Sequence, residues 1–365
     1  CLRRARPIHG PKRADSHESS LMNLGTQVMS LAGRDRIRGA TAILAAAGAL
    51  SLAAPARADI VPLADQLRGI AIPQEQCEAL PRAVFIAVAG REFCIRYYLS
   101  VAGGSGKGPL VFLQGDRLGR LNGQTGEFAP GPRDRDLDTR DFNKIATLLS
   151  QQAGVPAIYL ARPGLDGSSG NHRIRHTSLE LNVVNAALDA IKQRHNFVGF
   201  HLLGQSGGST LIGGLLGLRS DLGCAVIGAG VLSYPRPRRS SDPAADYFNA
   251  ADFVASIARK RNTRILLVTD PADRKVPERV QTEFAQRLKL AGGEVEQFLV
   301  QATDDDRHGV LSYARTAMNS CLRSASDEDI RAQLTRQIAT NLATKANSET
   351  QRQIIARDGG FQPAQ

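Results

Sequence analysis

The sequence predicts an α/β fold in which a mainly parallel sheet is covered by helices on both faces. Near-continuous apolar runs recur along the chain, which is typical of strands that are buried on both sides. Segments with apolar residues at helical spacing separate some of these runs. This alternation of strand and helix favours a parallel sheet. The six runs are 109–114, 156–161, 198–204, 224–230, 264–269 and 295–300.

The first 58 residues predict an export leader, which we set apart from the fold. Closely spaced arginines precede the apolar run 40–54, and Ala56-Arg57-Ala58 follows it as a small–x–small cleavage site. The run is shorter than the roughly 20 apolar residues that a membrane span needs. The alternative, a buried core helix, does not account for the ordered three-part pattern. We expect residues 1–28 to be upstream translation or an extended gene model, Met29 to be the start, and the protein to be periplasmic or secreted.

The net charge of +11 depends strongly on this leader. Residues 1–58 hold nine Lys and Arg and three Asp and Glu, which leaves 37 bases and 32 acids, a net charge of +5, on residues 59–365. The remaining chain has no basic stripe interleaved with aromatic residues, so we expect no nucleic-acid partner. A composition with 42% hydrophobic and 22% charged residues excludes collagen, coiled coil and wholesale disorder.

An antiparallel hairpin is predicted before the parallel strands, from 83–88 and 92–99 with a turn at Gly90-Arg91. Apolar and polar residues alternate in the second run, as in a strand with two different faces. The hairpin adds antiparallel strands at one edge of the sheet.

Four cysteines remain after the leader, an even number that permits two disulfides in an exported protein. We favour Cys77 with Cys94 and Cys224 with Cys321, since the first two flank the predicted hairpin. The alternative is buried free thiols. No CxxC or Cys/His ligand spacing is present, so we expect neither a zinc site nor any other cofactor.

Three amphipathic helices are predicted from apolar residues at three- and four-residue spacing, over 177–194, over 276–290 and after the last strand. Ser326 can cap the third of these helices. We therefore assign 59–343 to one catalytic domain and expect 344–365 to be a polar, frayed tail. The apolar stripe of the last helix is Ile330, Leu334, Ile338 and Leu342.

One motif that carries chemistry is Gly204-Gln205-Ser206-Gly207-Gly208, a G-x-S-x-G sequence. It directly follows the apolar run 198–204 and opens a helical stretch, the context that a nucleophile elbow requires. Small residues at Gly204 and Gly208 let the strand and the helix approach each other. The alternative is a glycine-rich turn with an idle serine.

A serine hydroxyl needs a base, and His308 is the one histidine that follows Ser206 in the sequence. It lies beyond the last strand, where the chain order Ser, Asp, His places the base. Two candidate acids, Asp270 and Asp273, follow the strand 264–269. We favour Asp273, because Asp270 suits turn formation ahead of Pro271.

These residues resemble the α/β-hydrolase superfamily over about residues 80–322. The family's D-x-x-V-P pattern matches 273–277, which supports Asp273 as the acid. The family's oxyanion loop, usually His-Gly-x, matches Gln114-Gly115-Asp116, with Gln in place of His. The resemblance implies oxyanion donors at the N–H groups of Asp116 and Gly207. The segment 161–170 is similar to a loop of bacterial esterases, dienelactone hydrolases and prolyl-oligopeptidase-type domains.

The 33 residues between Gly230 and Arg264 are where this family inserts a lid. They offer one helix, over about 247–260, so we expect a small lid or none. Basic loops after two strands form a possible substrate rim for an anionic substrate, although a solvated basic face is the more ordinary interpretation. The rim candidates are His172, Arg173, Arg236 and Arg238.

The sequence therefore predicts an exported serine hydrolase that cleaves a carboxylic ester or thioester through an acyl-enzyme. Its substrate would be a small-molecule or peptide acyl compound, and after cleavage of the leader we expect no membrane span. Two alternatives remain: a serine peptidase of the prolyl-oligopeptidase type, and a non-catalytic binding protein on a hydrolase scaffold. The second alternative is less consistent with the presence of three triad candidates.

Overall fold

The chain divides into two units, Cys1–Ala53 and Ala54–Gln365. A computed structural model describes part of the second unit, and the predicted leader and cleavage site lie outside this part. The described residues are 62–102, 108–117, 120–121, 128–129, 137–234, 246–260 and 262–358.

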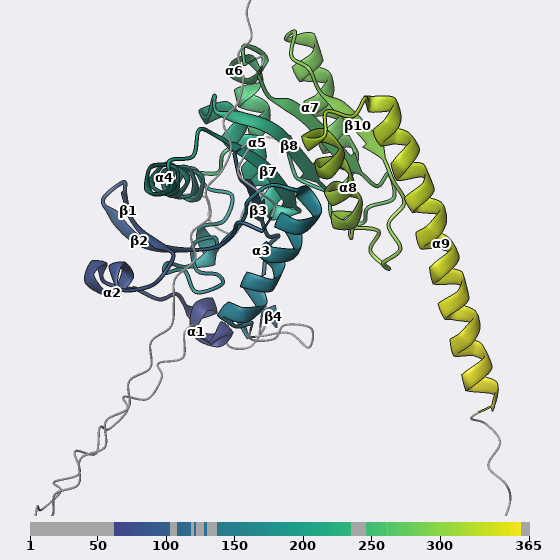
Figure 1. The fold of residues 1–365 in the computed structure, drawn as a ribbon, viewed down its shortest axis with the longest axis horizontal. Helices are drawn as coiled ribbons and strands as arrows, with labels where there is room; N and C mark the ends of the chain where they lie inside the picture. The colour runs from purple at the N-terminus through teal and green to yellow at the C-terminus, as the bar shows by residue number, and fades with distance from the viewer. Residues whose placement is uncertain are drawn as a thin grey trace, which may run out of the picture. The chain divides into compact units, whose positions relative to one another are not determined.

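An eight-stranded mixed sheet forms the centre of the second unit (Figure 1). Each of the eight apolar or alternating runs identified in the sequence forms one of its strands, and two short strands pair separately. The sheet strands are β1 (Ala83–Val88), β2 (Arg91–Ser100), β3 (Leu110–Leu113), β6 (Ala157–Leu160), β7 (Phe200–Gln205), β8 (Leu222–Gly228), β9 (Arg264–Thr269) and β10 (Glu296–Leu299), and the separate pair is β4 (Arg120–Leu121) with β5 (Phe128–Ala129).

The strand order is β1-β2-β6-β3-β7-β8-β9-β10. The pairs from β6 to β10 are parallel, whereas β2 is antiparallel to both β1 and β6. This confirms the prediction of a mainly parallel sheet with an antiparallel hairpin at its edge. All six parallel strands therefore end at the same edge of the sheet, where ligands of α/β sheets gather.

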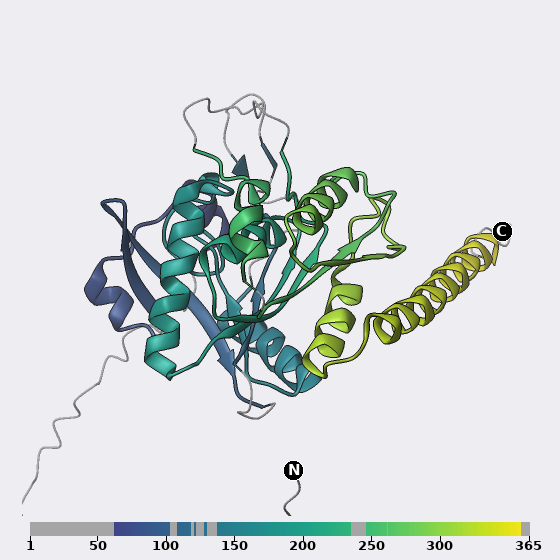
Figure 2. The same cartoon turned by 90° about the horizontal axis from the view of Figure 1, so that it is seen from above.

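Helices cover both faces of the sheet, as predicted (Figure 2). One apolar core joins one sheet face to α4, α5, α6 and α7, and a second joins the other face to α3, α8 and the start of α9. The helices are α1 (Leu63–Arg68), α2 (Gln74–Glu78), α3 (Thr139–Ala153), α4 (Ser178–His195), α5 (Gly207–Leu218), α6 (Val254–Ala258), α7 (Arg279–Leu290), α8 (Leu311–Leu322) and α9 (Asp327–Asp358), with 3-10 turns η1 (His172–Ile174) and η2 (Ala250–Phe253).

Local signals set the ends of these helices. Asp138 caps α3, its carboxylate accepting hydrogen bonds from two first-turn N–H groups, and Gly154 ends that helix in the left-handed conformation with φ 69°. Ser326 accepts a hydrogen bond from the N–H of Asp329 at 3.1 Å, so it caps α9 as predicted. The helix continues to Asp358, through residues for which we expected a frayed tail.

The described part of the predicted lid region contains only η2 and α6. They are shorter than the helix expected over 247–260 and pack against α5. Phe253 lies against Gly217 of α5, where an added Cβ would meet the ring at 2.4 Å. These short helices thus belong to the helical layer that covers one face of the sheet.

Two disulfides, in the favoured pairing, connect this framework. Cys77–Cys94 joins α2 to β2 across 17 residues of sequence, and Cys224–Cys321 joins β8 to α8 across 97 residues. All four cysteines are buried.

We expect the longer disulfide to stabilise the fold more than the shorter one. Chain entropy predicts that replacing Cys224 and Cys321 together by alanine lowers the free energy of unfolding by about 3–5 kcal/mol. The matched change at Cys77 and Cys94 should cost about 2–3 kcal/mol, because the closed loop is shorter. Urea unfolding of both double variants measures the difference. An equal loss, or a larger loss at Cys77 and Cys94, would contradict the prediction.

Within the described ranges, no helix combines the length and apolar character that crossing a membrane requires.

Candidate functional site

Ser206 lies at the turn between β7 and α5, in the strand–turn–helix context that the motif predicts. Its φ of 53° is in a region that non-glycine residues rarely adopt. The Ser206 N–H donates to Gly228 O at 2.8 Å, which fixes the turn against the neighbouring strand β8. Strained backbone of this kind clusters at functional sites and costs about 1–3 kcal/mol.

The two outer glycines of the motif allow the close approach of β7, β3 and α5. A Cβ at Gly204 would meet the N atom of Ser209 at 2.7 Å. A Cβ at Gly208 would meet Leu113 O at 2.1 Å, because α5 begins directly against the end of β3. Side chains at either position would push the elbow away from the sheet.

His308 pairs with Asp273, the acid that we favoured. The distance between His308 Nδ1 and Asp273 Oδ2 is 2.8 Å, and the Asp273 side chain is 1% exposed. The other carboxylate oxygen of Asp273 accepts the N–H groups of Lys275 at 2.8 Å and Val276 at 2.9 Å. These bonds fix the carboxylate and hold the His308 ring by one nitrogen, which leaves Nε2 available as a base.

The elbow and the histidine loop meet through Gln205. Its Nε2 donates to the backbone oxygen of His308 at 2.8 Å. Among the described contacts, no hydrogen bond joins Ser206 Oγ to the His308 ring. Catalytic hydrogen bonds are often long before substrate binds, so this geometry is compatible with proton transfer.

Asp270, the alternative acid, is fully engaged elsewhere. It binds the guanidinium of Arg307 through both carboxylate oxygens, at 2.7 and 2.9 Å. It also accepts the N–H groups of Ala272 at 2.8 Å and Ala302 at 2.7 Å. Asp270 therefore anchors the residue that precedes His308 rather than the imidazole itself.

The loop after β3 lies against the start of α5. A Cβ at Gly115 would meet the Cβ of Ser206 at 3.2 Å, so the loop passes close to the serine. Among the described contacts, neither the N–H of Asp116 nor that of Gly207 donates a hydrogen bond. Within the described residues, both amides predicted as oxyanion donors thus lack a protein acceptor.

The strand order β1-β2-β6-β3-β7-β8-β9-β10, with β2 antiparallel to both of its neighbours, and the strand–turn–helix that carries Ser206 after β7 together define one architecture. The chain has the α/β-hydrolase fold.

No protein-family model matches this sequence, and no curated protein sequence matches it. Solved structures with a similar arrangement include a Pyrococcus furiosus esterase, with a TM-score of 0.47 and 12% identity over 70% of this chain and 97% of the esterase. A Pyrococcus horikoshii acylaminoacyl peptidase has a TM-score of 0.42 and 14% identity over 67% of this chain and 39% of the peptidase. Est1E from Butyrivibrio proteoclasticus, solved with ferulic acid, has a TM-score of 0.44 and 14% identity over 66% of this chain and 98% of Est1E. All three scores are below 0.5, so the fold assignment rests on the strand order and the elbow.

The possible substrate rim is only partly described. Arg236 and Arg238 lie outside the described residues, and Arg173 is exposed. His172 is 2% exposed and lies in the interior, with Nε2 3.6 Å from Asp116 Oδ1, rather than at a surface rim. His172 is the first residue of the 3-10 turn η1 and the buried residue of that turn.

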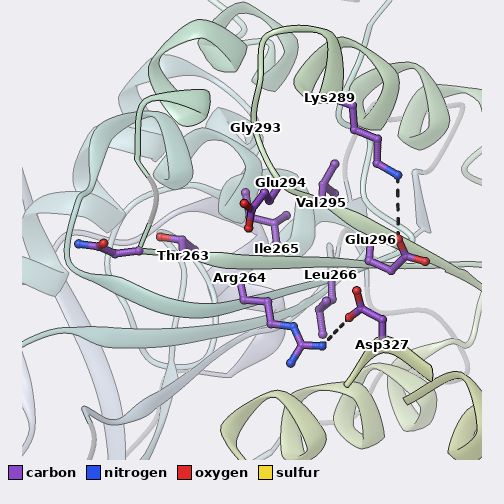
Figure 3. Close-up of a pocket in the computed structure, with 11 residues that line it drawn as sticks. Thr263, Arg264, Ile265, Leu266, Lys289, Gly293, Glu294, Val295, Glu296 and Asp327 are labelled. Atoms are coloured by element: carbon purple, nitrogen blue, oxygen red, sulfur yellow. Dashed lines mark hydrogen bonds and ion pairs between the residues drawn. The ribbon is translucent and has the colours of Figure 1, made fainter. Parts of the chain in front are cut away.

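Elsewhere in the described residues, the side chains offer less support for a metal site or a binding site. No group of three or more His, Cys, Asp or Glu among them is arranged to hold a metal ion. A cavity of about 570 Å³ lies where β9 and β10 begin, at the sheet edge opposite Ser206 (Figure 3). Four of its five charged residues form the ion pairs Arg264–Asp327 and Lys289–Glu296.

Sequence reasoning missed Arg162, Glu180, Gln205 and Arg307, which form the bonds around the predicted site. Of these four residues, Arg162 was the easiest to predict from the sequence, because it comes two residues after the end of β6. Side chains at that edge of a parallel sheet converge on the ligand site.

Proposed function

We propose that this protein is an exported serine hydrolase that cleaves a carboxylic ester or thioester through an acyl-enzyme. The observation that carries the proposal is the 2.8 Å bond between His308 Nδ1 and the buried Asp273 carboxylate, beside a strained elbow serine. A neutral imidazole that donates from Nδ1 to a carboxylate presents Nε2 as a base.

In the proposed reaction, Ser206 Oγ attacks the substrate carbonyl carbon while His308 Nε2 accepts the serine proton. The carbonyl oxygen becomes an oxyanion that accepts hydrogen bonds from the N–H groups of Asp116 and Gly207. Collapse of this intermediate breaks the bond to the alcohol or thiol, which takes the proton from His308. Water, deprotonated by His308, then hydrolyses the acyl-enzyme and restores Ser206.

Export is supported by the two disulfides, since disulfides persist in oxidising compartments. If the leader is cleaved after Ala58, N-terminal sequencing of the exported protein should start at Asp59. A mature protein that retains the apolar run 40–54 would contradict this part of the proposal.

The test of the activity uses the oxidised protein from Asp59 to Gln365 and a fluorophosphonate probe. We expect a single covalent adduct, located on Ser206 by mass spectrometry, and turnover of p-nitrophenyl acetate and longer esters. Labelling of Ser206 with cleavage of peptide anilides alone would favour the peptidase. A folded protein that is neither labelled nor active on esters or anilides would overturn the proposal and favour a binding protein.

A further inference from the structure

A buried arginine lies beneath the proposed oxyanion site. Arg162 follows β6, and its side chain is 1% exposed, which makes it the largest fully buried side chain in the described part of the chain. A buried guanidinium requires partners for its charge and for its hydrogen-bond donors, because removing it from water costs free energy.

Two of its hydrogen bonds go to the loop after β3. Arg162 Nη1 donates to Asp116 Oδ1 at 2.8 Å and to Gln114 O at 3.2 Å. The guanidinium therefore binds the residues on both sides of Gly115, at the segment whose amide at Asp116 is a proposed oxyanion donor.

The opposite side of the guanidinium is anchored in α4. Arg162 Nε donates to Glu180 Oε1 at 2.9 Å, and Glu180 is completely buried in the first turn of that helix. The other oxygen of Glu180 accepts the N–H of His176 at 2.6 Å. A rigid helix thus fixes Arg162, and Arg162 in turn fixes the loop.

Arg162 also lies against the second proposed donor. A Cβ at Gly207 would lie 1.9 Å from Asp116 Oδ1 and 3.0 Å from Arg162 Nη1. Only glycine leaves room for the carboxylate and the guanidinium at this point. The Arg162–Asp116 pair therefore packs directly on the residue that follows Ser206.

We propose that Arg162 is the positioning residue of the oxyanion hole: by bridging Glu180 to Asp116 and packing on Gly207, it sets the spacing of the two amide donors. This inference rests on the proposed serine hydrolase function and extends it to residues outside the triad. Because a donor must lie within about 2.7–3.1 Å of the developing oxyanion, a small shift of this loop weakens transition-state binding.

The charges of the cluster agree with this role. Burial alone would raise the pKa of Asp116, but the charge of Arg162 and the adjacent histidines outweigh it and hold that pKa well below its usual range. Burial would likewise lower the pKa of Arg162, but Glu180 and Asp116 raise it. Arg162, together with Arg175, whose Nε lies 3.5 Å from Asp116 Oδ2, therefore offsets the negative charge of the Asp116 carboxylate beside the proposed oxyanion site.

The experiment compares Arg162→Lys and Asp116→Asn with the wild type, using p-nitrophenyl acetate and a trifluoromethyl ketone that forms a tetrahedral adduct. Lysine keeps the charge but cannot reach both carboxylates with a planar fork. We expect kcat to fall about 10- to 100-fold in Arg162→Lys and about 3- to 30-fold in Asp116→Asn, with KM changed less than about threefold. The ketone should bind more weakly by a similar factor, which a loss of stability alone would not cause.

Arg219→Lys is the matched control. Arg219 is also buried, at 5% side-chain exposure, and pairs with Asp189 and Asp221 at 2.7 Å each. It precedes β8, at the end of the sheet away from Ser206. We expect this variant to lose stability while its kcat and its affinity for the ketone stay within twofold of the wild type.

The outcomes separate this inference from the proposed function. An active wild type whose two site variants keep kcat and ketone affinity within twofold overturns the inference alone, as does an equal kinetic loss in Arg219→Lys. A wild type without esterase activity or labelling overturns both. If Arg162→Lys does not fold, Asp116→Asn decides, because it preserves the side-chain shape and the backbone N–H.

Discussion

Replacing Ser206 by alanine is expected to lower kcat on p-nitrophenyl esters about 10⁴-fold or more and to abolish fluorophosphonate labelling. The alanine removes the attacking oxygen but leaves the two amides of the proposed oxyanion site in place, so a small residual rate over water should remain. His308→Ala should lose a comparable factor. Steady-state kinetics on active-site-titrated protein measures both effects.

The double variant of Ser206 and His308 provides the sharper test. Residues that act as one unit in catalysis are strongly non-additive, so we expect the double variant to be no slower than either single variant. Ser209→Ala is the control: Ser209 is a buried serine in α5, the helix that follows Ser206, and its Oγ accepts the N–H of Gly228 at 2.9 Å. It should lose stability but keep its labelling. Full labelling of Ser206→Ala would show that another residue is the nucleophile.

The strands could be predicted from the sequence because their signal is local. The run 264–269 contains four consecutive apolar residues, 265–268, which is typical of a short strand buried on both faces. The predicted ends of the strands were less accurate where the backbone conformation of a single residue decides where the strand stops. The run 224–230 suggested a strand through Gly230, but β8 ends at Gly228 because Ala229 has a φ of 51°, which a strand cannot contain.

The candidate site likewise contains residues that a local sequence signal predicts and residue pairs that no such signal predicts. The elbow at Ser206 has a five-residue signature, and His308 was predictable because it is the single histidine after that motif. The Asp116–Arg162 pair has no such signature, because its members are 46 residues apart and meet only when β3 and β6 lie side by side. Asp270 and Arg307, 37 residues apart, meet for the same reason, in the loops that follow the neighbouring strands β9 and β10. Pairwise contacts across a sheet depend on strand order, which a single sequence does not encode locally.

Asp273→Asn should lower kcat by about 10³- to 10⁴-fold with little change in stability. Asparagine can still accept the N–H groups of Lys275 and Val276, so the loop keeps its shape. Its amide nitrogen would instead face His308 Nδ1, and a donor there favours the imidazole tautomer that cannot act as a base at Nε2. The KM for esters should stay within a few-fold, because the change leaves the two proposed oxyanion donors in place.

The two acids make opposite predictions, so Asp270→Asn is the matched comparison. Here the buried amide leaves Arg307 without its carboxylate partner, which should lower the free energy of unfolding by about 1–3 kcal/mol. The effect on kcat should be smaller, about 3- to 30-fold, because Arg307 positions His308 through the backbone rather than through the ring. Urea unfolding and steady-state kinetics on both variants separate stability from catalysis. If Asp270→Asn lost more activity than Asp273→Asn, then Asp270 would be the acid of the triad, and the bond between Asp273 and His308 would be a resting arrangement that substrate binding replaces.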